Sequence, residues 1–192
     1  DLAASGGYYI AMAGDQIIAH PTSLIGSIGV IALKVNLKDL MAKIGVDVEI
    51  VKSGDKKDFM SPFRSFTQEE RDLFQNTIDR FHNRFVTTIV ENRSKLNKSE
   101  VQTLADGRVY DAEQAKDFKL IDHIGYVTDT IQRVRSDMKN SNLKLITYHR
   151  SNDYQGNIYS QFQKPTSFNL VNLDLGFNPN SLSPYFLYIW AP

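Results

Sequence analysis

The sequence predicts an α/β fold in which a mostly parallel sheet is flanked by helices. Strand-like, helix-like and strand-like patterns follow one another over residues 26–51, and this order is typical of a βαβ unit. An amphipathic pattern over residues 67–92 adds a long helix. With 192 residues, of which 42% are hydrophobic, the chain is long enough for one domain with a sizeable core.

A run of small residues, Ala3 to Gly7, stands near the start and leads into the mostly apolar residues 8–13. Small residues are poor strand and helix formers, so we expect a helix over residues 5–13 with Ser5 at or just before its start. A serine in this position has two interpretations. Either its hydroxyl caps the helix, or it is a nucleophile whose oxyanion is held by the N–H of the next residue.

The elements that follow are short. Residues 16–19 are expected to form an apolar strand, and a turn follows. Residues 26–33 indicate a buried strand whose glycines let another backbone approach closely. Asn36 caps a short helix that Gly45 ends, and alternation over residues 46–51 predicts the next strand. The apolar face of that helix consists of Leu37, Leu40, Met41 and Ile44.

Helices and short strands alternate in the second half of the chain. After a polar loop over residues 52–64, Thr67 and Glu70 have the spacing of a capping box, which predicts a helix that extends to about Asn92. The later expected helices begin at Ser99, run from Asp111 to Phe118 and cover residues 127–138. The later expected strands lie within residues 107–110, 120–125 and 143–148.

The composition excludes several classes of function. Twenty-two basic and 22 acidic residues give a net charge of zero, so no basic surplus indicates a nucleic-acid partner. The chain has no cysteine, which excludes disulfides and thiolate chemistry. Its four histidines lack metal-ligand spacing, so they indicate no metal site.

The composition changes after Arg150, and this change predicts a domain over residues 1–150 and an aromatic-rich tail over residues 151–192. The tail is expected either to dock on a partner subunit or to be disordered. Its candidate interface anchors are Tyr185, Phe186, Tyr188, Ile189 and Trp190. Because no strand precedes the small-residue turn and the chain opens on Asp1, we also expect that an N-terminal part is missing.

A serine nucleophile needs a base, and the loop from Lys52 to Asp58 offers three lysines after an expected strand end. A lysine serves as a base only if its pKa falls from about 10.4 toward neutral. A loop with two lysines between aspartates is often simply solvated. The apolar residues 59–63 favour the other interpretation, because they would draw part of the loop below the surface.

Four segments together resemble peptidase family S49, the Ser-Lys peptidases that include the signal peptide peptidases A. The resemblance extends over about residues 1–140, with the segments in the family's order and spacing. The first, Asp1 to Ala11, resembles the nucleophile segment, and Lys52 to Arg64 resembles the lysine loop. The others are Thr22 to Val30 and the Ala105-Asp106-Gly107-Arg108-Val109-Tyr110 segment with its continuation to Asp122.

This resemblance implies a ClpP/crotonase-like fold and hydrolysis of peptide bonds without a cofactor. By position in the motifs, Ser5 corresponds to the nucleophile, Lys57 to the general base and Ser27 to a serine that supports the lysine. The N–H of Gly6 corresponds to one oxyanion donor. The family's second donor is a glycine upstream of the nucleophile, in a region this sequence does not contain.

Beside these roles, Asp58 is expected to point away from Lys57, because pairing would keep the lysine charged. Lys52 and Lys56 are expected to be solvated. His20 is expected to be a turn residue, and His82 to be a surface or packing residue of the long helix.

The function predicted from the resemblance is a serine endopeptidase that acts on signal-peptide remnants or other membrane-associated peptides. We expect a homo-oligomer, held at a bacterial inner membrane by an anchor in the missing N-terminal part, with the catalytic domain on the extracytoplasmic side. The alternative is a non-catalytic homologue that binds peptides or membrane proteins. A third option, an acyl-CoA enzyme, is suggested by the fold alone.

Overall fold

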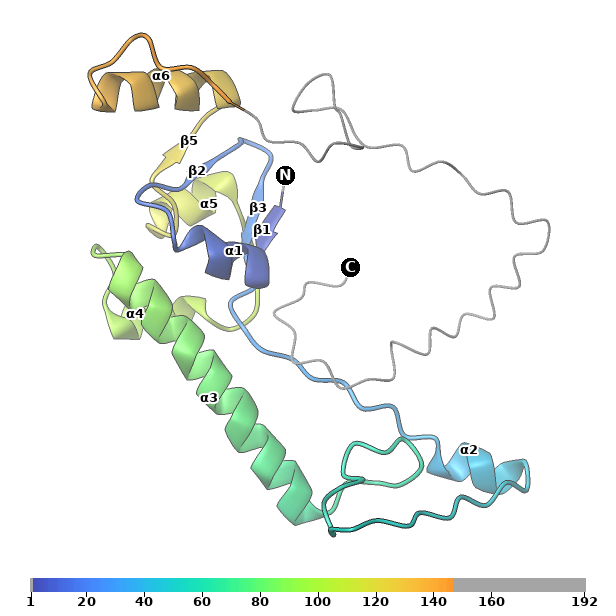
Figure 1. Ribbon diagram of the computed structural model, residues 1–192. Coiled ribbons are helices and arrows are strands. Elements are labelled where there is room, and N and C mark those ends of the chain that lie inside the picture. The colour runs from blue at the N-terminus through green and yellow to red at the C-terminus, as the bar shows by residue number, and fades with distance from the viewer. Residues whose placement is uncertain (1, 147–192) are drawn as a thin grey trace, which may run out of the picture. The chain divides into compact units, whose positions relative to one another are not determined.

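The computed structural model describes residues 2–146, which divide into two compact units between Tyr126 and Val127 (Figure 1). The helix α6 (Val127–Asp137) belongs to the second unit. The expected tail over residues 151–192, its aromatic anchors and the end of the strand expected over residues 143–148 lie outside the described residues. Residues 143–146 form no strand.

The first unit contains two small sheets, which make the chain an α/β protein. In the three-stranded sheet, β3 (Leu24–Gly26) lies between β1 (Leu2–Ala4) and β4 (Val109–Asp111). The β1–β3 pair is parallel and the β3–β4 pair is antiparallel. In the second sheet, β2 (Ile18–Ala19) pairs in parallel with β5 (His123–Ile124). Parallel and antiparallel pairs therefore occur together in the described residues.

The helices begin where the sequence supplies a capping side chain. The long helix α3 (Gln68–Asn92) has the predicted capping box, in which Thr67 and Glu70 each accept a backbone N–H of the other. Helix α5 (Ala112–Asp117) begins in the same way after Asp111. Helix α4 (Lys98–Leu104) is capped by Asn97, two residues before the predicted start at Ser99. The remaining helices are α1 (Gly6–Ala11) and α2 (Lys38–Lys43).

The core lies between α1, the end of α3 and the segment around Leu120. The side chain of Tyr8 is fully buried, and its hydroxyl donates to the carbonyl oxygen of Leu120 at 2.7 Å. The ring of Tyr9 meets the buried ring of Phe85 edge to face, with 5.2 Å between centroids. Desolvation raises the pKa of Tyr8 far above its usual value. Tyr8 is thus a core residue.

The predicted βαβ unit over residues 26–51 is wrong. Only Leu24–Gly26 pairs as a strand, and residues 46–51 form no ladder despite their alternating pattern. Their apolar side chains Val46, Val48 and Ile50 remain 41–45% exposed. A strand needs a partner for its backbone groups, and the described residues provide none here. Asn36 precedes α2 by two residues and accepts the N–H of Lys38, while Leu37 is the N-cap.

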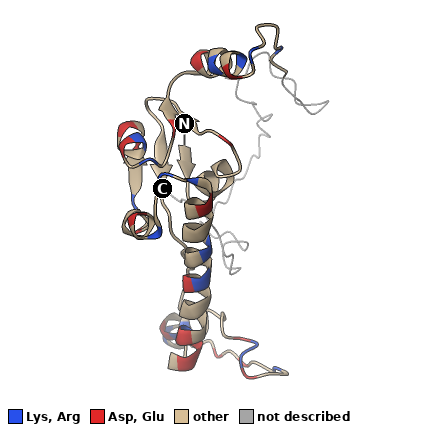
Figure 2. Ribbon diagram, turned by 90° about the vertical axis from the view of Figure 1, so that its left-hand side faces the viewer, with Lys and Arg blue, Asp and Glu red and all other residues tan. Residues whose placement is uncertain are grey.

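Charges of both signs alternate along α3 (Figure 2), in keeping with the net charge of zero. No helix among residues 2–146 combines the length and the apolar character that spanning a bilayer requires.

Candidate active site

Ser5 occupies a strained turn between β1 and α1. Its backbone has φ 51° and ψ −116°, a conformation that costs a non-glycine residue about 1–3 kcal/mol. The residue is only 3% exposed, and its hydroxyl does not accept an N–H of the helix that it precedes. This geometry is not that of a capping serine. It is the strand–turn–helix arrangement in which nucleophilic serines are held at an elbow.

The surrounding structure fixes this turn from both sides. The N–H of Ser5 donates to the carbonyl oxygen of Gly26 at 2.7 Å, and the carbonyl oxygen of Ser5 accepts the N–H of Tyr9 at 2.9 Å. The adjacent Tyr8 is anchored in the core through its hydroxyl. Strain of this kind persists only where neighbouring contacts hold the backbone in place, as they do here.

The structure brings Ser27 to the same sheet edge as Ser5. In the parallel β1–β3 pair Ala4 lies opposite Gly26, so both serines follow directly after neighbouring strand ends. Ser27 also has a positive φ of 48°, and its N–H donates to the carbonyl oxygen of Arg108 at 2.8 Å. Ligand sites of parallel strands commonly lie at such carboxyl ends.

Gly26 permits the close packing behind Ser27, as the sequence predicts for this segment. It has φ 106°, and a Cβ atom there would lie 2.8 Å from Cδ2 of Tyr110 and 3.0 Å from the carbonyl oxygen of Arg108. Gly6, the first residue of α1, directly follows Ser5. Its N–H makes no hydrogen bond to the backbone of another described residue.

The described structure does not bring Lys57 to these residues. Lys57 is exposed, and its N–H donates to the carbonyl oxygen of Gly54 at 3.0 Å within the loop. No contact among residues 2–146 joins it to Ser5 or Ser27. The loop instead packs against the region before α2, where the N–H of Leu37 donates to the carbonyl oxygen of Pro62 at 2.7 Å.

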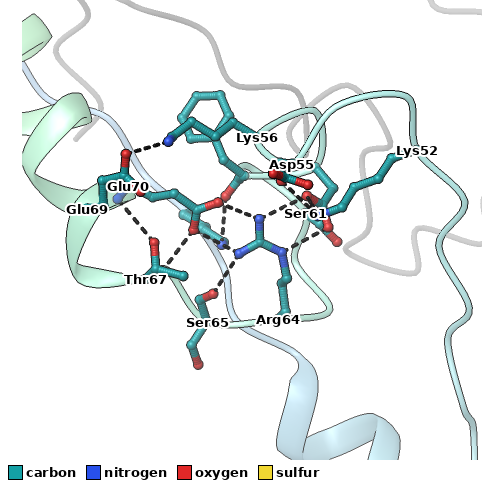
Figure 3. A network of polar contacts seen from close by, with 12 residues as sticks. Lys52, Asp55, Lys56, Ser61, Arg64, Ser65, Thr67, Glu69 and Glu70 are labelled. Carbon is teal, nitrogen blue, oxygen red and sulfur yellow. Dashed lines mark hydrogen bonds and ion pairs between the residues drawn. The ribbon is translucent and has the colours of Figure 1, made fainter.

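A network of charged side chains orders the Lys57 loop (Figure 3). As expected, the carboxylate of Asp58 points away from Lys57, because it accepts from Lys52 at 2.8 Å and from Arg64 at 2.9 Å. Arg64 also donates to both carboxylate oxygens of Glu70. Lys56 pairs with Glu69. Lys52 and Lys56 are both exposed, as expected, and each also forms an ion pair.

These contacts change how the acids of the loop titrate. Hydrogen bonds from Arg64, with a further one from Lys52, hold the pKa of Asp58 well below its usual range. Hydrogen bonds from Arg64 and from the Thr67 backbone lower the pKa of Glu70 to about 2. The two carboxylates in turn raise the pKa of Arg64. Both acids are ionised at every physiological pH.

Sequence reasoning missed the role of Arg64 and did not foresee the buried pair of Arg93 and Asp122. Arg64 stands six residues from both Asp58 and Glu70, a spacing that matches no helix or strand period, so no sequence pattern indicates these contacts. Arg93 donates to Asp122 at 2.7 Å, and this carboxylate also accepts the N–H of Ile17, which ties the end of α3 to the β2 region. These contacts stabilise the core and do not touch Ser5.

The side-chain contacts of His20 and His82 lie away from Ser5. Nδ1 of His20 contacts the hydroxyl of Thr22 at 2.8 Å in the predicted turn. His82 lies on α3, and its Nε2 contacts the carbonyl oxygen of Ala105 at 2.9 Å. No group of three potential metal ligands occurs among the described residues.

Comparison with known proteins identifies the family to which this chain is similar. Residues 1–141 match the profile of peptidase family S49. A candidate signal peptide peptidase SppA of Enterococcus faecium is 38% identical over 154 residues, which cover 80% of this chain and 44% of that protein. The candidate protease MJ0651 of Methanocaldococcus jannaschii is 35% identical over 77% of this chain and 47% of its own.

A plant relative, the chloroplastic serine protease SPPA of Arabidopsis thaliana, is 33% identical over 68% of this chain and 19% of its own length. The chain spans a little under half the length of the first of these relatives, at 44% and 47%.

Proposed function

Since this chain belongs to peptidase family S49, we propose that it is a serine peptidase in which Ser5 is the nucleophile and Lys57 the general base. The observation that carries the proposal is the turn at Ser5. Ser5 is buried in a strained strand–turn–helix elbow and does not cap its helix, and this geometry supports its assignment as the nucleophile. The same elbow supports a ClpP/crotonase-like fold for the complete protein.

In this reaction the hydroxyl oxygen of Ser5 attacks the carbonyl carbon of the scissile peptide bond. Neutral Lys57 takes the hydroxyl proton and later gives it to the leaving amine. The N–H of Gly6 donates to the oxyanion of the tetrahedral intermediate. Water then hydrolyses the acyl-enzyme, with the lysine again acting as the base. We assign to Ser27, which follows the neighbouring strand end, a supporting hydrogen bond with the lysine.

The test of the nucleophile is Ser5→Ala in the full-length protein, assayed with a small peptide ester. We expect hydrolysis to fall by about 10⁴-fold or more, since a serine peptidase without its nucleophile retains only residual catalysis. Ser23→Ala is the matched control, because Ser23 is also buried, at 5% exposure, and lies one strand away. Undiminished turnover by Ser5→Ala would overturn the assignment.

As the substrate class we propose peptides released at a membrane, such as cleaved signal peptides. The support is the name of the Enterococcus faecium relative, together with the proposed location at a bacterial inner membrane. A panel of signal-peptide remnants and of soluble peptides of equal length tests this choice. Equal kcat/KM for the two sets would contradict it.

We further propose that the protein works as a homo-oligomer. Between residues 31 and 51 a series of apolar side chains is exposed, and a second copy would remove this surface from water. The series consists of Ile31, Leu33, Val35, Leu40, Ile44, Val46, Val48, Ile50 and Val51. Light scattering that gives the mass of one chain at micromolar concentration would contradict this proposal.

One observation favours a second candidate function, a peptide-binding homologue without catalysis. No contact within residues 2–146 joins Lys57 to Ser5, so the dyad is not assembled by the described part of one chain. The two functions are separated by measuring binding and turnover of the same peptide. A wild-type protein that binds the peptide but does not hydrolyse it would favour the non-catalytic, peptide-binding function.

A further inference from the structure

Arg64 uses its whole guanidinium group in the loop that carries Lys57. Nε and Nη2 donate to the two carboxylate oxygens of Asp58, both at 2.9 Å. Nη1 and Nη2 donate to the two carboxylate oxygens of Glu70, at 2.8 and 2.6 Å. The remaining N–H of Nη1 donates to the carbonyl oxygen of Ser65 at 3.1 Å. All five donors of the group are satisfied, and the planar fork holds both carboxylates in fixed orientations (Figure 3).

Arg64 thereby connects the residue after Lys57 to a rigid element. Asp58 directly follows Lys57 in the loop, whereas Glu70 belongs to the capping box that begins the 25-residue helix α3. The side chain of Glu70 is 5% exposed and that of Asp58 is 11% exposed, so neither carboxylate is free to move into solvent. Most backbone bonds of the loop join near neighbours, such as Ser61 N–H to the carbonyl oxygen of Asp58 at 2.8 Å, and one bond joins Pro62 to Leu37.

The other charges that face Arg64, Asp58 and Glu70 come from three segments. Lys52, at the start of the loop, pairs with Asp58 at 2.8 Å. The carboxylates of Asp58 and Glu70 therefore face the cations of Arg64 and Lys52. Lys34, from the segment before α2, interacts electrostatically with Arg64, Glu70 and Asp58. Its Nζ donates to the carbonyl oxygen of Phe59 at 2.9 Å and lies 3.9 Å from the centre of the Phe66 ring. The Lys56–Glu69 pair and Asp55 lie at the exposed rim.

Lys57 takes no part in these pairs. Within residues 2–146 its side chain has no hydrogen bond and no ion pair, although a carboxylate is attached to the very next residue. A lysine next to an unpaired carboxylate would be stabilised in its charged form, which cannot accept a proton. Arg64 removes that carboxylate from reach, because a bidentate guanidinium pair is stronger than a single contact from an ammonium group.

We propose that Arg64 is a positioning residue for catalysis, which keeps Lys57 available as a neutral base by holding both oxygens of Asp58 against α3. The proposal rests on the proposed function, in which Lys57 is the base. The depressed pKa of Asp58, caused first by its hydrogen bonds from Arg64, agrees with it. Arg64 does not touch the reacting atoms and acts only through Asp58.

The test is the pH dependence of kcat/KM for Arg64→Gln in the full-length protein, with a small peptide ester as the substrate. Loss of Arg64 removes the bidentate partner of Asp58 and leaves Lys52 and Lys34 as the cations near the two carboxylates. The carboxylate of Asp58 is then no longer held against α3, and in reach of Lys57 it favours the ammonium form. We expect the rising limb of the profile to move upward by about 0.5–1 pH unit. Activity near neutral pH should fall about 3–10-fold and approach the wild-type value at alkaline pH.

A second substitution separates this role from simple loop support. In Arg64→Gln with Asp58→Asn the unpaired carboxylate is gone, so the rising limb should return to its wild-type position. Arg64→Lys keeps the charge without the two bidentate pairs, and we expect an upward shift smaller than that of Arg64→Gln. The matched control is Arg71→Gln on α3, an exposed arginine without an ion pair in the described residues, which should leave the limb in place.

The outcomes distinguish this inference from the proposed function. If Lys57→Ala retains activity, Lys57 is not the base and the proposed function fails. If Lys57→Ala is inactive but Arg64→Gln loses activity equally at every pH, Arg64 has a merely structural role and only the inference fails. If Arg64→Gln does not fold, as judged by its thermal unfolding, Arg64→Lys decides the question. An unmoved limb in Arg64→Lys would then overturn the inference.

Discussion

Ser5 lies in a well-packed part of the chain, whereas Lys57 lies on a loop that polar side chains order. Around Ser5 the backbone is held by the β1–β3 pair, by the bond to Gly26 and by the fully buried Tyr8. Around Lys57 the order comes from ion pairs to Asp58 and Glu70, and neighbouring apolar residues from 31 to 51 are exposed.

The two residues of the proposed dyad therefore depend on different forces. The nucleophile depends on packing and backbone geometry, which change little with pH or salt. The base depends on hydrogen-bonded charges, which weaken when their acids are protonated. Substitutions that disturb one region should therefore leave the other intact, and the predictions below test this independence.

The largest expected effect is the loss of turnover in Lys57→Ala, by about 10³–10⁴-fold in kcat/KM on a peptide ester. The fold around Ser5 should be unchanged, because Lys57 has no side-chain partner in the described structure. Lys56→Ala is the matched control, one residue away, and removes only the pair with Glu69. Loss of turnover in Lys56→Ala with normal rates in Lys57→Ala would reverse the assignment of the base.

The next largest effect is on stability, in the Ser5 region alone. In Gly26→Ala a new Cβ would meet the Tyr110 ring at 2.8 Å, on a backbone with φ 106°. We expect a loss of about 2–4 kcal/mol in the free energy of unfolding, from strain and overpacking together. Urea denaturation measures this loss.

The control for this prediction comes from the other region. Gly54 lies in the Lys57 loop, and a Cβ there would meet no atom within 4 Å. Gly54→Ala should change the free energy of unfolding by less than about 0.5 kcal/mol. Equal losses in the two variants would show that the loop is packed as tightly as the Ser5 region.

The sequence predicts the locally encoded elements of the fold but not the contacts between distant residues. The bounds of α3 and the cap of α5 depend on residues three or four positions apart, so the Thr67, Glu70 and Asp111 patterns identify them. Residues 46–51 have the alternation of a strand but no partner in the described chain, and pairing partners are not encoded locally. The contact of Arg64 with Asp58 and Glu70 has no periodicity, so no sequence pattern indicates it.

The candidate site was predicted in part for similar reasons. A turn at Ser5 follows from its small neighbours, but its φ of 51° and its lack of a cap hydrogen bond require the structure. The placement of Ser27 beside Ser5 depends on the register of two strands, which nothing in either segment specifies alone. The pairing of Ser5 with Lys57 remains a prediction.

A smaller effect tests whether function maintains strain at Ser5. Ser5→Gly relieves a backbone strain of about 1–3 kcal/mol and adds about 0.5–1 kcal/mol of chain entropy to the unfolded state. We therefore expect Ser5→Gly to be more stable than Ser5→Ala in urea, by up to about 2.5 kcal/mol, which is the difference of those terms. Both variants should be inactive. A Ser5→Gly variant less stable than Ser5→Ala would show that the turn is not strained.

The smallest effect concerns the acid stability of the Lys57 loop. The pKa of Glu70 is lowered to about 2 by Arg64 and by its helix cap, whereas an unfolded glutamate titrates near 4.3. A carboxylate with a depressed pKa stabilises the folded state above its unfolded pKa, and this contribution is lost as the pH falls toward the folded value. Glu70→Gln keeps the capping box but removes the charge that Arg64 binds.

We therefore expect Glu70→Gln to be less stable than wild type in urea at pH 7, with a difference that shrinks below about pH 4.3 and vanishes near pH 2. Glu100→Gln is the matched control, since Glu100 closes the capping box of α4 and its nearest cation, Lys119, lies 4.0 Å away. The control should show a smaller change between the two pH values, because an exposed pair at that distance contributes little. Equal pH dependence in both variants would mean that Arg64 does not stabilise the start of α3, and the loop would then owe its order to the backbone turns alone.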